Sequence, residues 1–171
     1  TKNTTEALNL GIKGLLRSGD HVITTSMEHN SVLRPLKSLE KLGITHSVLR
    51  ADRNGLLTAA DIEKTIRPNT KLIIVTAASN VTGGKMPIAE IGELAKRKGI
   101  FFMVDGAQGA GCMPLDVAHM HIDLLAFPGH KGLLGPQGSG GLYAAPRTAL
   151  RPMLEGGTGT ESKSREQPRE F

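Results

Sequence analysis

The sequence predicts an α/β fold with three layers, in which a mostly parallel sheet is flanked by helices. Two observations predict it: short apolar runs recur along the 171 residues, and amphipathic helical patterns lie between them. Apolar runs without alternation are typical of strands that are buried on both faces of a parallel sheet. Strands that alternate with helices indicate a layered α/β domain, and the length suits a single domain with a substantial core.

Six strands are expected, one at each apolar run. They lie at 21–26, 46–50, 71–76, 100–104, 122–127 and 140–145. Three helices have recognisable features between or before them. The first has its apolar residues on one face, namely Leu8, Ile12, Leu15 and Leu16. It is expected to end near Gly19. Another begins at Thr58 and Asp61, which stand at capping-box spacing, and a third runs from Pro87 to Gly99.

The composition excludes several classes of protein. Hydrophobic residues make up 39% of the chain and charged residues 22%, which is typical of a soluble globular domain. No apolar stretch approaches the ~20 residues that span a bilayer, so no membrane association is expected. Basic residues give a net charge of +5, but they are scattered and aromatics are only 3%, which argues against nucleic acid as a partner. The single cysteine, Cys112, is compatible with a reducing, cytoplasmic compartment.

Polar side chains follow four of the predicted strands at the point where each strand ends. In chain order they are His29, Asn80, Asp105, Gln108, His130 and Lys131. Ligands of open α/β sheets bind beyond the carboxyl ends of the strands, so these side chains are expected to converge at one edge. Lys131 stands out because a primary amine follows a buried strand inside a glycine-rich loop.

The start of the chain offers an anion site. Asn3 and Glu6 have capping-box spacing, and Thr4 and Thr5 fall in the first helical turn. Backbone N–H groups and hydroxyls there face outward at the positive end of the helix dipole, where a phosphate binds well. An ordinary N-cap would have the same residues, so this feature alone does not decide the function.

Together these groups describe one cofactor. The Lys131 amine can form a Schiff base with an aldehyde, and Asp105 can keep a pyridine nitrogen protonated so that the ring accepts electrons. A helix N-terminus with Thr4 and Thr5 can hold a phosphate. An aldehyde, a pyridinium and a phosphate are the three functional parts of pyridoxal 5′-phosphate. The sequence therefore predicts a pyridoxal-phosphate site.

Five motifs, in this order, resemble the large domain of class V pyridoxal-phosphate enzymes, and especially the cysteine desulfurases. They are "TTEALNL", "MEHNS", "SNVTG", "VDGAQ" and "GHKGLLGPQGSGGLY". The resemblance implies that Lys131 is the Schiff-base lysine and that Asp105 pairs with the pyridine nitrogen. It also implies a set of cofactor contacts: Gln108 and Asn80 near the phenolic oxygen, His29 stacked on the ring as a proton shuttle, and Thr4, Thr5 and His130 at the phosphate.

The resemblance further implies an enzyme that cleaves the carbon–sulfur bond of L-cysteine, passes the sulfur to a thiol and releases alanine. Such enzymes are homodimers, and a sulfur-acceptor protein is an implied partner. A class V aminotransferase, another carbon–sulfur or carbon–selenium lyase, or a non-catalytic pyridoxal-phosphate-fold binding protein would carry the same residues. The fold type implied is that of fold type I pyridoxal-phosphate-dependent transferases.

Two departures from the family pattern bear on these expectations. Pro128 stands where the desulfurases commonly have a phosphate-binding serine. The family's chains are also longer, with a preceding N-terminal segment and a C-terminal small domain that holds the persulfide-forming cysteine. Residues 1–155 are thus expected to form a partial cofactor-binding domain and 156–171 a polar tail. This chain alone is expected to be an inactive fragment.

Each site residue also has a purely structural interpretation. Asp105 could cap a helix, and Asn80 suits a turn in either case. His29 could be a surface histidine before a helix capped by Asn30 or Ser31. Another pair, His119 and His121, has no third ligand at suitable spacing, so no metal site is expected.

Overall fold

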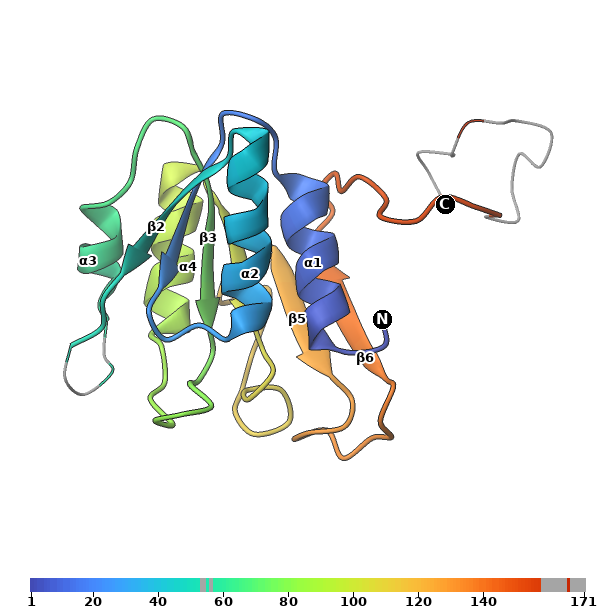
Figure 1. Cartoon of the computed structure of the whole chain (residues 1–171). Coiled ribbons are helices and arrows are strands. Elements are labelled where there is room, and N and C mark those ends of the chain that lie inside the picture. The colour runs from blue at the N-terminus through green and yellow to red at the C-terminus, as the bar shows by residue number, and fades with distance from the viewer. Residues whose placement is uncertain (53–54, 56, 158–165, 167–171) are drawn as a thin grey trace.

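The computed structural model describes residues 1–52, 55, 57–157 and 166, and it contains one six-stranded sheet (Figure 1). The strands are β1 (His21–Thr25), β2 (Thr45–Leu49), β3 (Thr70–Thr76), β4 (Phe101–Asp105), β5 (Leu124–Pro128) and β6 (Gly140–Ala144). Their order across the sheet is β2-β1-β3-β4-β5-β6. The first five strands are parallel and β6 runs antiparallel to β5. The predicted mostly parallel α/β fold is confirmed, with each strand within a residue or two of its expected position.

Helices cover both faces of the sheet, which gives the three predicted layers (Figure 1). The α-helices are α1 (Thr4–Leu15), α2 (Asn30–Leu39), α3 (Ala59–Glu63) and α4 (Ile88–Lys98), and a short 3-10 helix, η1, spans Glu40–Leu42. Side chains alternate between the faces of a strand. Leu72 and Ile74 accordingly pack with α1 and α2, whereas Ile73 and Val75 pack with α3 and α4.

The helix ends follow the sequence signals with two differences. Thr58 forms the predicted capping box with Asp61, and Gly99 ends α4 in the left-handed region at φ 68°. The first helix ends at Leu15 rather than near Gly19, because the Arg17 guanidinium takes over the carbonyls of its last turn. Asn3 caps α1 as expected, but the Glu6 carboxylate accepts from the Lys2 N–H and not from Asn3, so the full capping box is absent.

Beyond β6 the chain runs away from the sheet toward residue 157 (Figure 1). Most of the predicted polar tail at 156–171 lies outside the described residues. Among the residues that the structure describes, no helix combines the length and the apolar character needed to cross a bilayer.

The start of β1 carries a buried histidine that ties three strands together. The His21 ring contacts Thr70 Oγ1 of β3 at 2.8 Å and Ser47 Oγ of β2 at 3.0 Å. Burial, together with the charges of Arg67 and His46, lowers the pKa of His21 from 6.5 to about 4. The His21 ring therefore stays neutral in the folded protein over a pH range in which the same ring is protonated in the unfolded chain.

This difference in pKa predicts that His21 contributes less to stability in mild acid. The unfolded chain binds one proton more at His21 than the folded protein between the two pKa values, 6.5 and about 4. The contribution of His21 to the free energy of unfolding should therefore decline as the pH drops through that window. Urea unfolding between about pH 7 and pH 5 checks this, with the difference in stability between wild type and His21→Gln expected to shrink as the pH falls. The control is His119→Gln, an exposed histidine, which should leave the pH dependence of stability unchanged. If His21→Gln and wild type had the same slope of stability against pH, the lowered pKa of His21 would be contradicted.

Candidate active site

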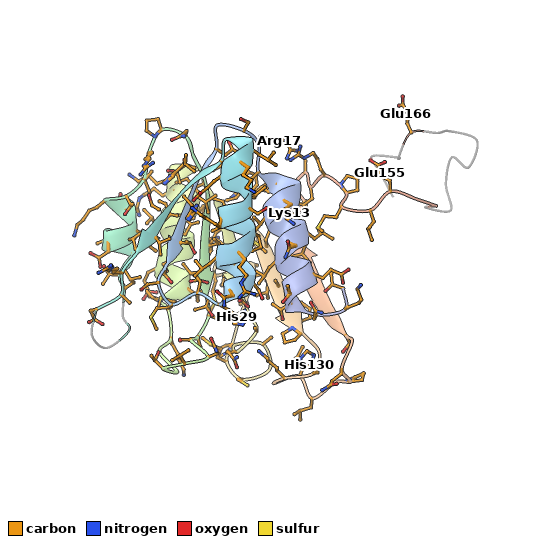
Figure 2. The ribbon with its side chains drawn as sticks, in the orientation of Figure 1. Lys13, Arg17, His29, His130, Glu155 and Glu166 are labelled. Atoms are coloured by element: carbon orange, nitrogen blue, oxygen red, sulfur yellow. The ribbon has the colours of Figure 1, made fainter. Side chains whose placement is uncertain are left out.

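A cavity of about 360 Å³ lies at the carboxyl edge of the sheet. All eight residues that the sequence predicted for a cofactor site line it: Thr4, Thr5, His29, Asn80, Asp105, Gln108, His130 and Lys131. Four parallel strands and the start of α1 bring them there, because strands that run the same way end at the same edge. His29 and His130 are seen at this edge in Figure 2, one at the base of α2 and the other on the loop after β5.

His29 is held by the first turn of α2. It is the N-cap residue of that helix, and its Nδ1 accepts the backbone N–H of Ser31 at 3.1 Å. The Ser31 hydroxyl also contacts Nδ1 at 2.8 Å, and it contacts Thr5 Oγ1 at 2.8 Å. Because Nδ1 accepts, the proton of the neutral ring is on Nε2. The cap is thus His29 itself, and not Asn30 or Ser31 as the structural interpretation of the sequence had it.

Asp105 is the last residue of β4 and is only 2% exposed. Its Oδ1 accepts the backbone N–H of Ala107 at 2.9 Å. Burial raises the pKa of Asp105, while the Ala107 hydrogen bond and the charges of Lys131 and His29 act in the opposite direction. A buried carboxylate is costly unless a cation or a strong donor meets it. The site is therefore suited to a ligand that brings a positive charge to Asp105.

Lys131 lies on the loop between β5 and β6, where glycines allow close packing. A side chain at Gly132 would come within 2.4 Å of the Ala110 carbonyl, and one at Gly129 within 2.1 Å of Ser139 Oγ. The absence of these side chains lets the loop pack tightly on its own neighbours. Leu134 takes a positive φ of 57°, which is uncommon outside glycine. The loop that carries Lys131 is therefore set by its packing rather than free at the surface.

The start of α1 also lines the cavity. Asn3 accepts the Glu6 N–H, and Thr4 and Thr5 stand in the first turn. The N–H groups of a helix's first turn are without intrahelical partners and carry partial positive charge. His130 and Lys131 also line the cavity, so an anion placed there would meet positive charge as well as hydroxyls.

Two loops complete the rim. Asn80 is exposed after β3, and half-buried Gln108 lies one turn beyond Asp105. Two large apolar side chains on these loops are exposed: Val81, next to Asn80, is 84% exposed, and Leu134, on the Lys131 loop, is 91% exposed.

Sequence reasoning missed three polar groups at or below the cavity. Ser31 and Thr76 line it, and Glu28 is buried directly before His29 with a hydrogen bond to Thr76. Ser31 and Thr76 looked like ordinary helix-start and strand residues. An acid between a buried strand and a candidate histidine was the one signal in the sequence that could have drawn attention to Glu28.

The structure also shows where Pro128 and Cys112 lie, and whether side chains gather that could bind a metal. Pro128 is the last residue of β5 and lines the cavity, so no side-chain hydroxyl is available at that position. Cys112 is exposed. Within the described part of the chain, no group of three or more His, Cys, Asp or Glu residues could hold a metal ion.

Comparison with known proteins identifies a matching family and several similar proteins. A family model described as Aminotransferase class-V matches residues 1–171. The chain is 39% identical over 163 residues to a protein of Eremothecium gossypii named mitochondrial cysteine desulfurase, covering 92% of this chain and 33% of that protein. The structure is similar to that of SspA in complex with cysteine, with a TM-score of 0.86, 38% identity, and coverage of 92% of this chain and 47% of the other.

A second solved structure is of C-DES with glycine covalently linked to its PLP cofactor. It matches with a TM-score of 0.78 and 32% identity, covering 85% of this chain and 40% of that one. The chain thus spans less than half the length of each of these three relatives. The family match nevertheless covers every residue of the sequence. The chain therefore belongs to the class-V aminotransferase family.

Proposed function

We propose that the cavity binds pyridoxal 5′-phosphate and that the protein cleaves the carbon–sulfur bond of L-cysteine. The observation that carries the proposal is the meeting of three groups in one cavity: the Lys131 amine, the buried Asp105 carboxyl and the Thr4–Thr5 helix start. They match the aldehyde, the ring nitrogen and the phosphate of the cofactor. The family membership and the relatives named cysteine desulfurase support the same reading.

The residues present fit the cofactor. Asp105 is buried and has one hydrogen bond, from Ala107, so it can accept a further N–H from a protonated ring nitrogen. Thr4, Thr5 and His130 would hold the phosphate, and the amine of Lys131 would take the aldehyde carbon. Gln108 and Asn80 would donate to the phenolic oxygen. When bound, pyridoxal phosphate supplies an electron sink for the electron pair released at the substrate's Cα.

The chain's own groups then have defined tasks. Asp105 would accept the N–H of the ring nitrogen and so help to keep that nitrogen protonated; burial raises the pKa of this carboxyl, and the positive charge of Lys131 opposes that rise. Lys131 would hold the aldehyde carbon of the cofactor, and as a free amine it would act as a base beside the substrate. His29 presents Nε2–H, because Ser31 occupies Nδ1, so its first available step is to donate that proton.

The proposal includes the partners that the family resemblance implies. The exposed apolar side chains Val81 and Leu134, on the loops that carry Asn80 and Lys131, support a homodimer. A thiol outside the described cavity would receive the sulfur, and a sulfur-acceptor protein would take it further, with alanine as the second product. Cytoplasmic location is part of the proposal, although one relative is named mitochondrial.

The test is to supply the intact protein with pyridoxal phosphate and L-cysteine. Equal amounts of sulfide and alanine are expected in the presence of a thiol reductant. Formation of a keto acid with transfer of the amino group would instead identify a class V aminotransferase. No change in the cofactor's absorbance on addition of any amino acid would favour a non-catalytic binding protein.

A further inference from the structure

A second carboxyl group is buried below the cavity. Glu28 is only 8% exposed, which is unusual for glutamate unless it is paired. Its Oε1 accepts two hydrogen bonds, from Thr25 Oγ1 at 2.6 Å and from the Thr76 backbone N–H at 3.0 Å. Its Oε2 is also buried, and no partner for it is found within the described residues.

These contacts join the parts of the structure that carry the site. Thr25 is the last residue of β1 and Thr76 is the last residue of β3. The Glu28 Oε1 therefore links the turn before α2 to β3, at a residue 48 positions further along the chain. Thr76 is the register partner of Asp105 on β4, and Glu28 directly precedes the N-cap His29. The position of His29 relative to Asp105 therefore depends on this side chain.

The surroundings of Glu28 suit a neutral carboxylic acid. An ionised carboxylate would leave a charged oxygen buried without a partner, which is costly. Burial raises the pKa of Glu28 to about 8, against the hydrogen bonds from Thr25 and Thr76, and the charge of Asp105 adds to the rise. Asp105 differs because the positive charge of Lys131 favours its charged form. Two neighbouring carboxyls in such unlike surroundings divide into one acid and one anion.

We propose that Glu28 is a positioning residue of the cofactor site. In its neutral form it fixes His29 against the end of β3 and leaves the negative charge of the carboxyl pair on Asp105. The proposal rests on the proposed function for the roles of His29 and Asp105. What it adds is that Glu28 is protonated and that it links the turn before α2 to the end of β3. Both points can be measured without enzyme turnover.

The protonation is tested by infrared spectroscopy of the cofactor-free intact protein at neutral pH. A carboxylic acid band is expected in wild type, shifted by isotope-labelled glutamate and lost in Glu28→Gln. The matched control is Glu90→Gln, an exposed acid on α4 that should leave the band unchanged. Absence of a glutamate acid band in wild type would overturn the proposal.

The positioning is tested by cofactor affinity and by the NMR signals of the His29 ring. Glu28→Gln keeps an acceptor oxygen and is expected to bind pyridoxal phosphate within about threefold of wild type, whereas Glu28→Ala should bind about tenfold more weakly. The NMR signals of the His29 ring should shift in Glu28→Ala but not in Glu28→Gln. Should that variant fail to fold, Thr25→Val removes one of the two donors and is expected to act in the same direction. Wild-type affinity and His29 signals in both Glu28→Ala and Thr25→Val would overturn the coupling.

The two levels of proposal fail in different ways. If the protein binds no pyridoxal phosphate at all, the proposed function fails, while the acid band and the His29 signals still report on Glu28. If the cofactor binds but the acid band is missing, the inference about Glu28 fails and the proposed function stands.

Discussion

Replacement of Lys131 by alanine is expected to abolish turnover of L-cysteine by the intact protein. The variant loses the only amine that lines the cavity among the described residues, and with it the group that takes the cofactor's aldehyde and later acts as a base. A rate decrease of about 10³-fold or more is expected when a nucleophile and base is removed. Steady-state sulfide release measures this loss.

Borohydride reduction of the cofactor-loaded wild type gives an independent check of the same residue. Peptide mapping should place the pyridoxyl group on Lys131. The matched control is Lys96→Ala, an exposed lysine on the far face of the sheet, which should retain wild-type turnover. Attachment of the pyridoxyl group at Lys96 or Lys85 would show that the loop after β5 is not the cofactor's anchor.

The second large effect is expected for Asp105→Asn. The asparagine can still accept the Ala107 N–H, so the turn after β4 should remain and the cofactor should still bind. It carries no negative charge, however, and so no longer favours a proton on the ring nitrogen. Turnover should fall by about 10²-fold to 10³-fold, and the absorbance spectrum of the bound cofactor should change with it.

The control for this variant is Asp116→Asn, which removes an exposed carboxylate that pairs with His119 far from the cavity. Turnover of Asp116→Asn should equal that of wild type. If Asp105→Asn also turned over at the wild-type rate, the proposed electron-sink role of Asp105 would be wrong, even if Lys131 remained the point of attachment.

Local sequence determined the elements and their order. The strands were predicted from short runs of apolar residues, and most plainly for β3 and β4, because a strand buried on both faces needs apolar side chains at each position. Cap residues such as Thr58 and Gly99 act within a few residues, so the ends of α3 and α4 could be predicted from them. The end of α1 could not, since it depends on how the Arg17 side chain folds back on the helix.

The candidate site was predictable for the same reason that the sheet was. Parallel strands end at one edge, so polar residues at their ends had to converge, and all of the predicted ones line the cavity. Their functional roles stay predictions. What the sequence could not give was the environment of each group: His29 looked like a candidate ligand and proved also to be the cap of α2.

Only the tertiary structure decided the electrostatics. The pKa values of Asp105 and Glu28 rise because strands and helices distant in sequence remove water from around them. The contact that identifies Glu28 joins it to Thr76, 48 positions away, and no local pattern reports such a distance. Sequence therefore determined which chemical groups reach the edge of the sheet, because strand direction is set by local periodicity and connectivity. Packing decided which of these groups are charged, because desolvation depends on the whole fold.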